Sequence, residues 1–347
     1  MQVGVNYPWF DFGWDFGLGP PAWRSTAAPP RWMSEIDRHL EHFADLGIDV
    51  VRWFILGDGL TYGSRFDAPQ PDADAADEFR FDPPPIGAPL LDHFDELLRR
   101  FEAFNVGRAR PVQLLPVFID FHFCNPGAPV SKPDPADPVQ RVPDLDWIKG
   151  GRADAIADPK KRRRFLDAAL EPLLSVSQQH ANVVFAWELI NEPDWITNGW
   201  NPDGRSNDPI ELTAMQAFLD EGVRRVRAAG FEATIGFGLI ETLLASGIAA
   251  DVHQFHHYPR GRRRLPPNPF DLEVPVMLGE FATASDIWPD LPRDRQDVLH
   301  RLRRAQEHGY PVALLWSFLS GDRYSSWSDA VQRDVRRFTH TESGTVT

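Results

Sequence analysis

The 347-residue sequence has a single cysteine, Cys124, and has no run of about 20 apolar residues. One cysteine excludes an intrachain disulfide and a zinc site built from several thiolates, so we expect Cys124 to be a small buried hydrophobic residue. Without a long apolar run, a membrane-spanning helix is not expected. Met1 is followed by neither a charged segment nor the apolar stretch of a secretion signal. As written, the sequence predicts a soluble cytoplasmic protein, or a secreted one if an export signal has been removed.

Positive charge is in the minority. The chain has 36 Lys and Arg against 50 Asp and Glu, which gives a net charge of −14 and a pI near 5.2. Nucleic acids and anionic membranes attract basic surfaces, so neither partner is expected. The basic stretch 160-KKRRR opens a predicted helix, and we interpret it as a solvated outer face.

Short apolar runs alternate with amphipathic stretches along the sequence. The runs have the composition of strands buried on both faces and cover residues 2–6, 49–56, 111–121, 183–191, 233–238, 251–258, 274–281 and 311–318. Helices are predicted over 34–47, with Ser34 as N-cap, and over 91–105, 160–180, 210–230, 293–309 and 328–338, with a shorter one in 239–248. This repeated alternation predicts an α/β fold, a (β/α)8 TIM barrel.

An open doubly wound sheet is the alternative to a barrel. That fold would be expected to carry a G-x-G-x-x-G turn after the first strand, and this spacing is missing here. The long strand-to-helix connections, residues 7–31, 57–90 and 122–158, fit a barrel, because such loops build its catalytic face. We predict one catalytic domain over residues 1–340, with 341–347 as a disordered tail and fraying from residue 339.

Two glutamates stand at the ends of predicted strands. Glu192 follows the fourth strand in WELINEP, and Glu280 ends the seventh in LGEF. A buried carboxylate has to be paired, hydrogen-bonded or protonated, so two of them at the mouth of an apolar barrel indicate chemistry. Such a pair suits glycoside hydrolysis, in which one carboxyl protonates the leaving oxygen and the other attacks the anomeric carbon or activates a water.

These motifs resemble those of the clan A glycoside hydrolases, and most of all family 5, the cellulases, mannanases and their relatives. The resemblance implies a barrel, no metal and no cofactor, with Glu192 as the acid/base and Glu280 as the nucleophile. It covers nearly the whole chain in order. Because the clan retains anomeric configuration, the two carboxyl groups are expected to be about 5–5.5 Å apart.

The resemblance extends to residues around the two glutamates. Arg52 in VVRW and Tyr258 in FHHYP match residues that support the nucleophile. His256 in the same motif matches a residue beside the acid/base. His122 in DFHF and Trp316 in the last strand match residues near the sugar at the reaction centre.

Elementary chemistry supports some of these roles. Asn191 can donate a hydrogen bond to a sugar 2-hydroxyl, a contact that strengthens in the transition state. Arg52 can hold a carboxylate in its ionised form by charge-assisted hydrogen bonds. Glu188 lies four residues before Glu192 and therefore points to the same side, one layer deeper. We expect it to be a buried structural partner, with Arg52 as the candidate.

Tryptophans follow several of the predicted strands, and sugars pack their C–H faces on aromatic rings. Trp9 and Trp195 are predicted to bind substrate. The other loop tryptophans, each equally open to a role in loop packing, are Trp14, Trp23, Trp147, Trp200, Trp288 and Trp327.

Other functions remain open at this stage. A metal-dependent barrel hydrolase would use His122, His253, His256 and His257, but its first strand would normally carry ligands, and VGVNY has none; His253 and His257 are therefore expected to be structural. A non-catalytic carbohydrate-binding barrel is the second alternative. The stretch 260-RGRRR, ending at Arg264, is either a solvated loop or a recognition site for an acidic or phosphorylated sugar. An oligosaccharide or polysaccharide is the expected partner, and glucan, mannan or a smaller β-glycoside are all open.

Overall fold

The computed structural model contains a closed parallel barrel. The residues it describes are 1–10, 13–17, 30–60, 83, 85–134, 136–137, 139–200, 210–258, 264–268, 274–284, 297–319 and 321–341. The barrel strands are β1 (Gln2–Asn6), β2 (Val50–Phe54), β3 (Gln113–Asp120), β6 (Trp187–Asn191), β7 (Ala233–Phe237), β8 (Val252–His257), β9 (Val276–Ala282) and β10 (Val312–Trp316). They close in the order β1-β10-β9-β8-β7-β6-β3-β2, so the predicted (β/α)8 barrel is confirmed.

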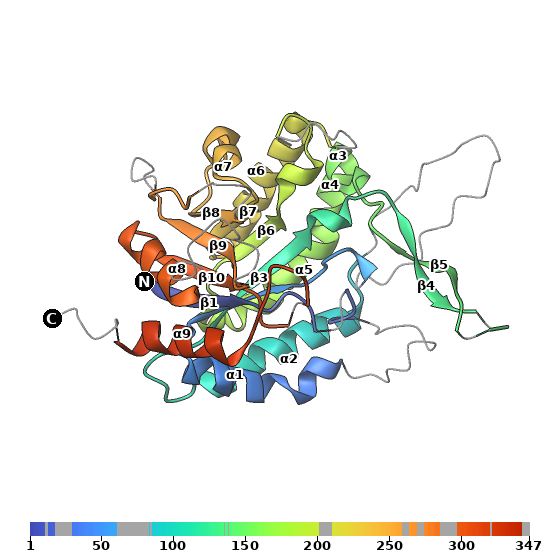
Figure 1. The fold of residues 1–347 in the computed structure, drawn as a ribbon. Coiled ribbons are helices and arrows are strands. Elements are labelled where there is room, and N and C mark those ends of the chain that lie inside the picture. The colour runs from blue at the N-terminus through green and yellow to red at the C-terminus, as the bar shows by residue number, and fades with distance from the viewer. Residues whose placement is uncertain are drawn as a thin grey trace, which may run out of the picture.

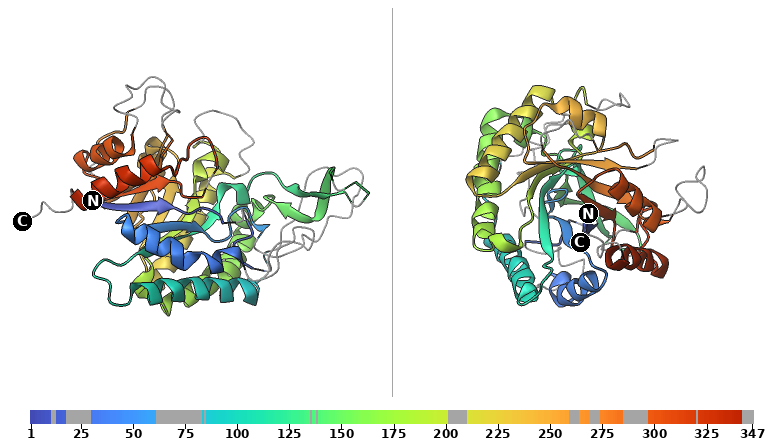
Figure 2. Two further views of the ribbon diagram at one scale, coloured as in Figure 1. Left: turned by 60° about the horizontal axis from the view of Figure 1, so that its bottom comes forward. Right: turned by 90° about the vertical axis from the view of Figure 1, so that its left-hand side faces the viewer.

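Helices cover the outside of the barrel and form a ring around the strands in the right-hand view of Figure 2. They are α1 (Ile36–Asp45), α2 (Ala88–Asn105), α3 (Asp154–Ala157), α4 (Pro159–Phe165), α5 (Glu171–Gln178), α6 (Leu212–Ala228), α7 (Ile240–Ser246), α8 (Val298–Glu307) and α9 (Asp329–Thr341). Their apolar faces pack with the outward-facing strand residues into one large core. Within the described residues, none of these helices has the length and apolar character needed to cross a bilayer.

The inside of the barrel has two layers of opposite chemistry. The lower one, which we call the apolar layer, consists of Val50, Leu115, Ala186, Val252, Met277, Val312 and Leu314. Residues two positions further along a strand point to the same side, one layer higher. There Arg52 follows Val50 and Gln254 follows Val252, and with Asn6, Glu188, Asn191 and Glu280 they form what we call the polar layer.

One predicted helix feature is wrong, and another helix is present with an internal irregularity. Ser34 is not an N-cap: it lies in a short 3-10 helix, η2 (Arg31–Ser34), and Glu35 precedes α1 instead. The predicted helix 160–180 is divided by a π-helical turn, η5 (Leu166–Leu170), between α4 and α5. Pro172 has no N–H to donate to the Ala168 carbonyl, which instead accepts a hydrogen bond from Ile86 N at 3.0 Å.

A β-hairpin occupies the predicted loop 122–158. Its strands, β4 (Ala128–Pro133) and β5 (Arg141–Lys149), pair antiparallel and project from the side of the barrel in Figure 1. The buried Arg152 guanidinium holds the base of the hairpin by donating to the carbonyl oxygens of Asp58, Ile148 and Gly150.

The C-terminal helix is longer than predicted. Residues 339–341 are helical where fraying was expected, because Thr339 is buried and its hydroxyl donates to Leu46 O at 2.7 Å. The helix therefore extends to Thr341, and residues 342–347 of the predicted tail lie outside the described residues.

Candidate active site

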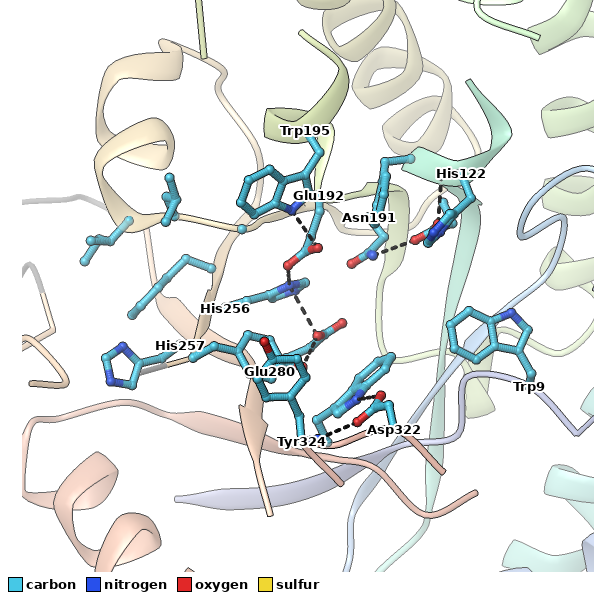
Figure 3. A pocket seen from close by; sticks show the side chains of 18 of the residues that line it. Trp9, His122, Asn191, Glu192, Trp195, His256, His257, Glu280, Asp322 and Tyr324 are labelled. Carbon is cyan, nitrogen blue, oxygen red and sulfur yellow. Dashed lines mark hydrogen bonds and ion pairs between the residues drawn. The ribbon is translucent and has the colours of Figure 1, made fainter. Parts of the chain in front are cut away.

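A cavity of about 1090 Å³ opens at the carboxyl ends of the barrel strands (Figure 3). Glu192 and Glu280 both face it, from opposite sides of the barrel mouth. Its lining also includes the predicted residues Trp9, His122, Asn191, Trp195, His256, Tyr258 and Trp316. Of the predicted site residues only Arg52 is not in the lining, because it lies one layer below the floor, where it is fully buried.

Glu280 is held by two short hydrogen bonds. Arg52 Nη1 donates to its Oε1 at 2.6 Å, and the Tyr258 hydroxyl donates to its Oε2 at 2.6 Å. Burial raises the pKa of Glu280 to about 7; the His256, Arg52 and Tyr258 groups act in the opposite direction, and Glu192 adds to the rise. Two donors thus fix the orientation of this carboxyl group and favour its ionised form against the effect of burial.

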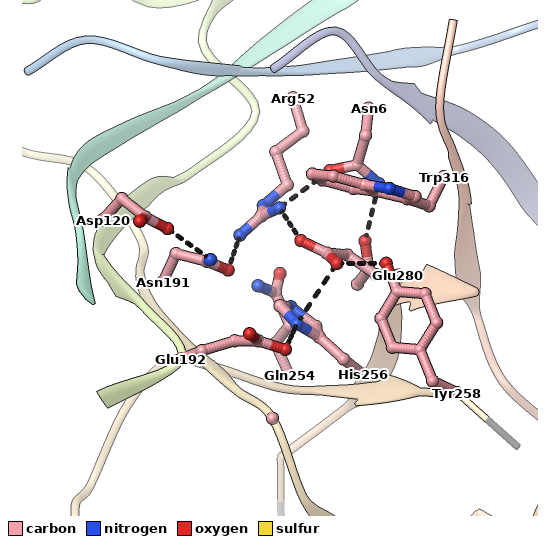
Figure 4. A network of polar contacts seen from close by, with 12 residues as sticks. Asn6, Arg52, Asp120, Asn191, Glu192, Gln254, His256, Tyr258, Glu280 and Trp316 are labelled. Carbon is pink, nitrogen blue, oxygen red and sulfur yellow. Dashed lines mark hydrogen bonds and ion pairs between the residues drawn. The ribbon is translucent and has the colours of Figure 1, made fainter. Parts of the chain in front are cut away.

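Arg52 is the centre of the polar layer (Figure 4). Its Nε and Nη2 donate to the two oxygens of Glu188, at 2.6 and 2.5 Å, while Nη1 and Nη2 also reach Asn6 Oδ1 and Asn191 Oδ1, both at 2.7 Å. Burial would lower the pKa of Arg52, but the charge of Glu188 outweighs it and the pKa lies above its usual value. Glu188 is therefore the buried partner of Arg52, as expected from the sequence.

A glycine makes room for this ion pair. A Cβ atom at Gly236 on β7 would collide with the Glu188 carboxylate and lie 2.7 Å from Gln254 Nε2. The same Gln254 amide donates to Glu188 Oε2 at 2.8 Å. Both oxygens of Glu188 thus accept hydrogen bonds, as a buried carboxylate requires.

Glu192 stands on a constrained turn directly after β6. Its backbone adopts φ 47° and ψ 52°, the left-handed region that a non-glycine residue occupies at a cost of about 1–2 kcal/mol. Its side chain accepts a hydrogen bond from the Trp195 indole N–H, at 2.8 Å from Oε2, and lies 3.0 Å from His256 Nδ1 through Oε1. The turn therefore directs the carboxyl group into the cavity, where Trp195 and His256 hold its two oxygens.

Asn191 links the two sides of the polar layer. Its Oδ1 accepts from Arg52, and its Nδ2 donates to Asp120 Oδ2 at 2.6 Å. Asp120 in turn accepts from the His122 backbone N–H and contacts the His122 ring. Burial lowers the pKa of His122, but the Asp120 carboxylate more than offsets this, so the pKa is raised. The chain of contacts fixes the Asn191 amide, which retains one N–H for the cavity.

Aromatic rings form another wall of the cavity. Trp316 lies edge-on to Trp9, with ring centroids 6.1 Å apart, and Trp9 stacks on Phe54. The Trp316 indole N–H donates to Asp322 Oδ2 at 2.7 Å, which fixes the plane of its ring. Both tryptophans therefore line the cavity in fixed orientations, and their predicted contact with substrate stays a prediction.

Four of the other loop tryptophans have packing roles instead. Trp14 is buried and contacts Trp147 at 4.7 Å between centroids. Trp200 is buried against Phe237, and Trp327 packs against Phe318. None of these four lines the cavity, so of the two roles left open for them the structure favours loop packing. Trp23 and Trp288 lie outside the described residues.

The histidines bear on the metal alternative. Glu192, His256 and Glu280 each offer one ligand atom, and these atoms lie within 4.8 Å of one another. However, Arg52 and Tyr258 direct their hydrogens at Glu280, and Trp195 directs one at Glu192, so the oxygens face donors and a buried positive charge. These donors do not fit a cation site.

His253 and His257 differ in position. His257, which we expected to be structural, lines the cavity, whereas His253 does not. Burial lowers the pKa of His253. Residues 260–263 of the basic stretch lie outside the described residues, and Arg264 lines the cavity.

Several residues of the site were not predicted from the sequence. Asn6 accepts from Arg52 and donates to Gly279 O at 3.0 Å, Gln254 supports Glu188, and Asp120 and Asp322 position Asn191 and Trp316. Asn6, Gln254 and Asp120 share one signal, a polar residue inside or at the end of an apolar strand. Asp322 lies in a loop and has no such signal.

β-Glycoside hydrolases are among the solved structures that share this architecture. A β-1,4-mannanase from the common sea hare Aplysia kurodai matches with a TM-score of 0.67 and 18% identity, over 97% of this chain and 92% of its own. An endo-1,4-β-mannanase from Eisenia fetida gives 0.69 and 17%, over 98% and 91%. A hyperthermophilic endo-β-1,4-glucanase gives 0.53 and 13%, over 96% of both chains. The protein thus has the fold of these barrel enzymes.

The sequence comparisons find no relative. No protein-family model matches this chain, and no curated protein matches it. The resemblance to the family 5 enzymes that the motifs predicted is confirmed at the level of the fold.

Proposed function

We propose that the chain is a retaining β-glycoside hydrolase with Glu280 as nucleophile and Glu192 as acid/base. The observation that supports this best is the short distance between the two carboxyl groups. A carboxylate oxygen of Glu192 and one of Glu280 lie within 4.8 Å of each other. Retaining enzymes hold their carboxyl groups about 5–5.5 Å apart, whereas inverting ones leave about 6.5–9.5 Å for a water. The separation therefore favours direct attack by a carboxylate.

The first step forms a covalent intermediate. A Glu280 oxygen attacks the anomeric carbon while Glu192 gives its proton to the glycosidic oxygen, and the C–O bond to the leaving group breaks. Arg52 and Tyr258, each 2.6 Å from a Glu280 oxygen, orient the attacking carboxylate. The second step reverses these roles: the Glu192 carboxylate takes a proton from water, the water oxygen attacks the same carbon, and Glu280 leaves.

The rest of the cavity would hold the sugar. Trp316 and Trp9 present aromatic faces, and Asn191 has an N–H available for a 2-hydroxyl. The matched structures include mannanases and a glucanase, which supports a β-linked glucan, mannan or smaller oligosaccharide as substrate.

The test is hydrolysis of a panel of aryl β-glycosides and β-linked oligosaccharides. Glu280→Ala should lower kcat/KM by about 10⁴–10⁶-fold, because the nucleophile acts together with its supporting groups. Azide should partly restore turnover by entering the space of the missing carboxylate and should give a glycosyl azide of inverted configuration. With Glu192→Ala, azide should instead give the azide of retained configuration.

A matched control is Glu221→Ala, which removes a carboxylate paired with Arg225 on the outside of α6 and should leave kcat/KM unchanged. Sugar binding without turnover by the wild-type protein would favour the non-catalytic barrel instead. An unaltered rate in Glu280→Ala would contradict the proposed nucleophile.

A further inference from the structure

Asp194 is a buried carboxylate with no role in the reaction described above. It lies two residues after Glu192, in the short helix η7 (Pro193–Ile196), and its side chain is fully buried. Gly238 N–H, at the end of β7, donates to its Oδ2 at 2.7 Å. Burial of a carboxylate is unfavourable, so a charge placed here needs a reason beyond packing.

Asp194 and Glu192 face the same point in the structure. A methyl group added at Gly238 would lie 3.3 Å from Glu192 Oε1, 3.3 Å from Trp195 Nε1 and 3.5 Å from Asp194 Oδ2. Gly238 has no side chain, so nothing from this residue separates the two carboxyl groups. The Trp195 indole donates to Glu192 across the same space.

The hydrogen bond to Gly238 also holds the turn that carries Glu192. This turn is otherwise held by Glu192 N–H donating to Gly236 O at 2.6 Å and by Thr197 Oγ1 donating to Pro193 O at 2.7 Å. Asp194 thus ties the short helix after the left-handed Glu192 to the end of the neighbouring strand. A strained backbone of this kind persists only where its surroundings fix it.

We propose that Asp194 is a positioning residue that ties the Glu192 turn to β7 and, through its negative charge, strengthens the hold of Glu192 on its proton. This rests on the proposed function, in which Glu192 has to stay protonated while Glu280 is ionised. Like charges in a buried site cannot both form easily, so an ionised Asp194 favours a neutral Glu192.

The titration of Asp194 supports this assignment. Burial raises its pKa to about 6, and the Thr242 hydroxyl on α7 and the Gly238 amide offset only part of the rise. Asp194 is therefore charged above about pH 6, the range in which Glu280, with a pKa of about 7, becomes ionised. Asp194 is therefore negatively charged in the same pH range in which Glu192 has to stay protonated.

Other groups also face Glu192. They are His256 from β8, Glu280 from β9, Tyr258 after β8, His122 from the helix η4 (Phe121–Phe123), and the Trp195 dipole from η7. His256 also interacts with the Asp194 charge. None of these side chains is itself replaced in Asp194→Asn, which removes the Asp194 charge and keeps the shape of its side chain.

The experiment uses the full-length protein without substrate and follows the Glu192 carboxyl carbon by NMR after ¹³C labelling of glutamate. The resonance is assigned by its loss in Glu192→Gln. In Asp194→Asn, which keeps an acceptor for Gly238 N–H, the Glu192 titration midpoint should fall by about one pH unit. The control Asp144→Asn changes a buried carboxylate of the hairpin and should leave the midpoint unchanged. An unshifted midpoint in Asp194→Asn would overturn the proposal.

Activity measurements separate the charge from the anchoring. For a glycoside with a poor leaving group, the pKa of the alkaline limb of kcat/KM should fall in Asp194→Asn by the same amount as the NMR midpoint. For a dinitrophenyl glycoside, whose leaving group needs no proton, the pH profile should stay unchanged. Asp194→Ala should slow both substrates, because the turn is also released. Equal behaviour of the two substrates in Asp194→Asn would contradict the role of the charge. A shifted midpoint in a protein that hydrolyses nothing would uphold the coupling and refute the proposed function.

Discussion

The two layers inside the barrel are built on the same strands but follow opposite rules. The apolar layer consists of aliphatic side chains packed on one another, such as Leu314 and Met277, and no hydrogen bonding is required of them. One layer higher, the Arg52 guanidinium lies among two carboxylates and two amides at 2.5–2.7 Å. The same step of two residues along β2, from Val50 to Arg52, leads from one layer to the other.

The difference shows how the barrel separates stability from chemistry. Aliphatic packing stabilises the fold and tolerates changes that keep volume. A buried ion pair is costly to desolvate and is often no better for stability than a hydrophobic pair of the same size. The polar layer is therefore best explained by what it does for Glu280 and Asn191, the two residues through which it contacts the cavity.

Of the variants that test the difference between the layers, Arg52→Met should have the largest effect, because it changes both stability and activity. It leaves Glu188 buried without its cation and should lower the free energy of unfolding by about 3–5 kcal/mol. It also removes a donor from Glu280, so kcat/KM should fall by about 10³-fold or more. Denaturant unfolding and steady-state kinetics measure the two losses.

The double variant Arg52→Met with Glu188→Met sharpens the result. With Glu188 replaced as well, much of the lost stability should return, because only Glu280 then lacks the Arg52 cation, and Tyr258 still donates to it. Activity should stay low, since Glu280 still lacks its donor. Recovery of activity together with stability would show that Arg52 acts only as a structural residue.

Truncating the apolar layer should give the opposite pattern. Leu314→Ala removes a fully buried side chain and should lower the free energy of unfolding by about 2–5 kcal/mol. The kcat of the remaining folded protein should stay within about twofold of wild type, because no residue of the apolar layer lines the cavity. A large fall in kcat at unchanged KM would show that the two layers are coupled.

The pH dependence should reveal the electrostatic balance of the polar layer. As the proposed nucleophile, Glu280 has to be ionised to attack, and its pKa is raised to about 7. Below that pH kcat/KM should therefore fall by about tenfold per unit, and above it the rate should level off until the alkaline limb set by Glu192 begins. A profile that stays flat down to about pH 5 would mean that Arg52 and Tyr258 overcome the effect of burial on Glu280.

The sequence was informative about the barrel because each strand is a local pattern. All the predicted strands are present, and the ends of the runs containing Glu192 and Glu280 lie at one mouth. The two glutamates could be found because they stand at the ends of apolar runs. A carboxylate buried there has to be paired, hydrogen-bonded or protonated, which indicates a functional role. Arg52 and Glu188 could be paired from the alternation of side chains along a strand.

Other features depend on contacts between distant segments and have no local pattern. Asn6 and Gln254 are single polar residues whose partners, Arg52 and Glu188, lie on other strands. The hairpin β4–β5 is not predicted from the sequence, because prolines in both strands suggest a loop. Trp147 lies on this hairpin, so its packing on Trp14 could not be predicted either. The left-handed turn at Glu192 also depends on Gly236 and Gly238 of the next strand.

The closure of the barrel has a consequence for how the protein is made. Strand β1 pairs with β10, so the first strand synthesised has to wait for the last before the sheet can close. Asn6 lies on this seam and donates to Leu315 O at 3.3 Å and to Gly279 O on β9. A nascent chain emerging from the ribosome thus carries Arg52 and Glu188 long before β9 and β10 arrive to complete their surroundings. The floor of the cavity therefore depends on long-range contacts, which form more slowly than local ones.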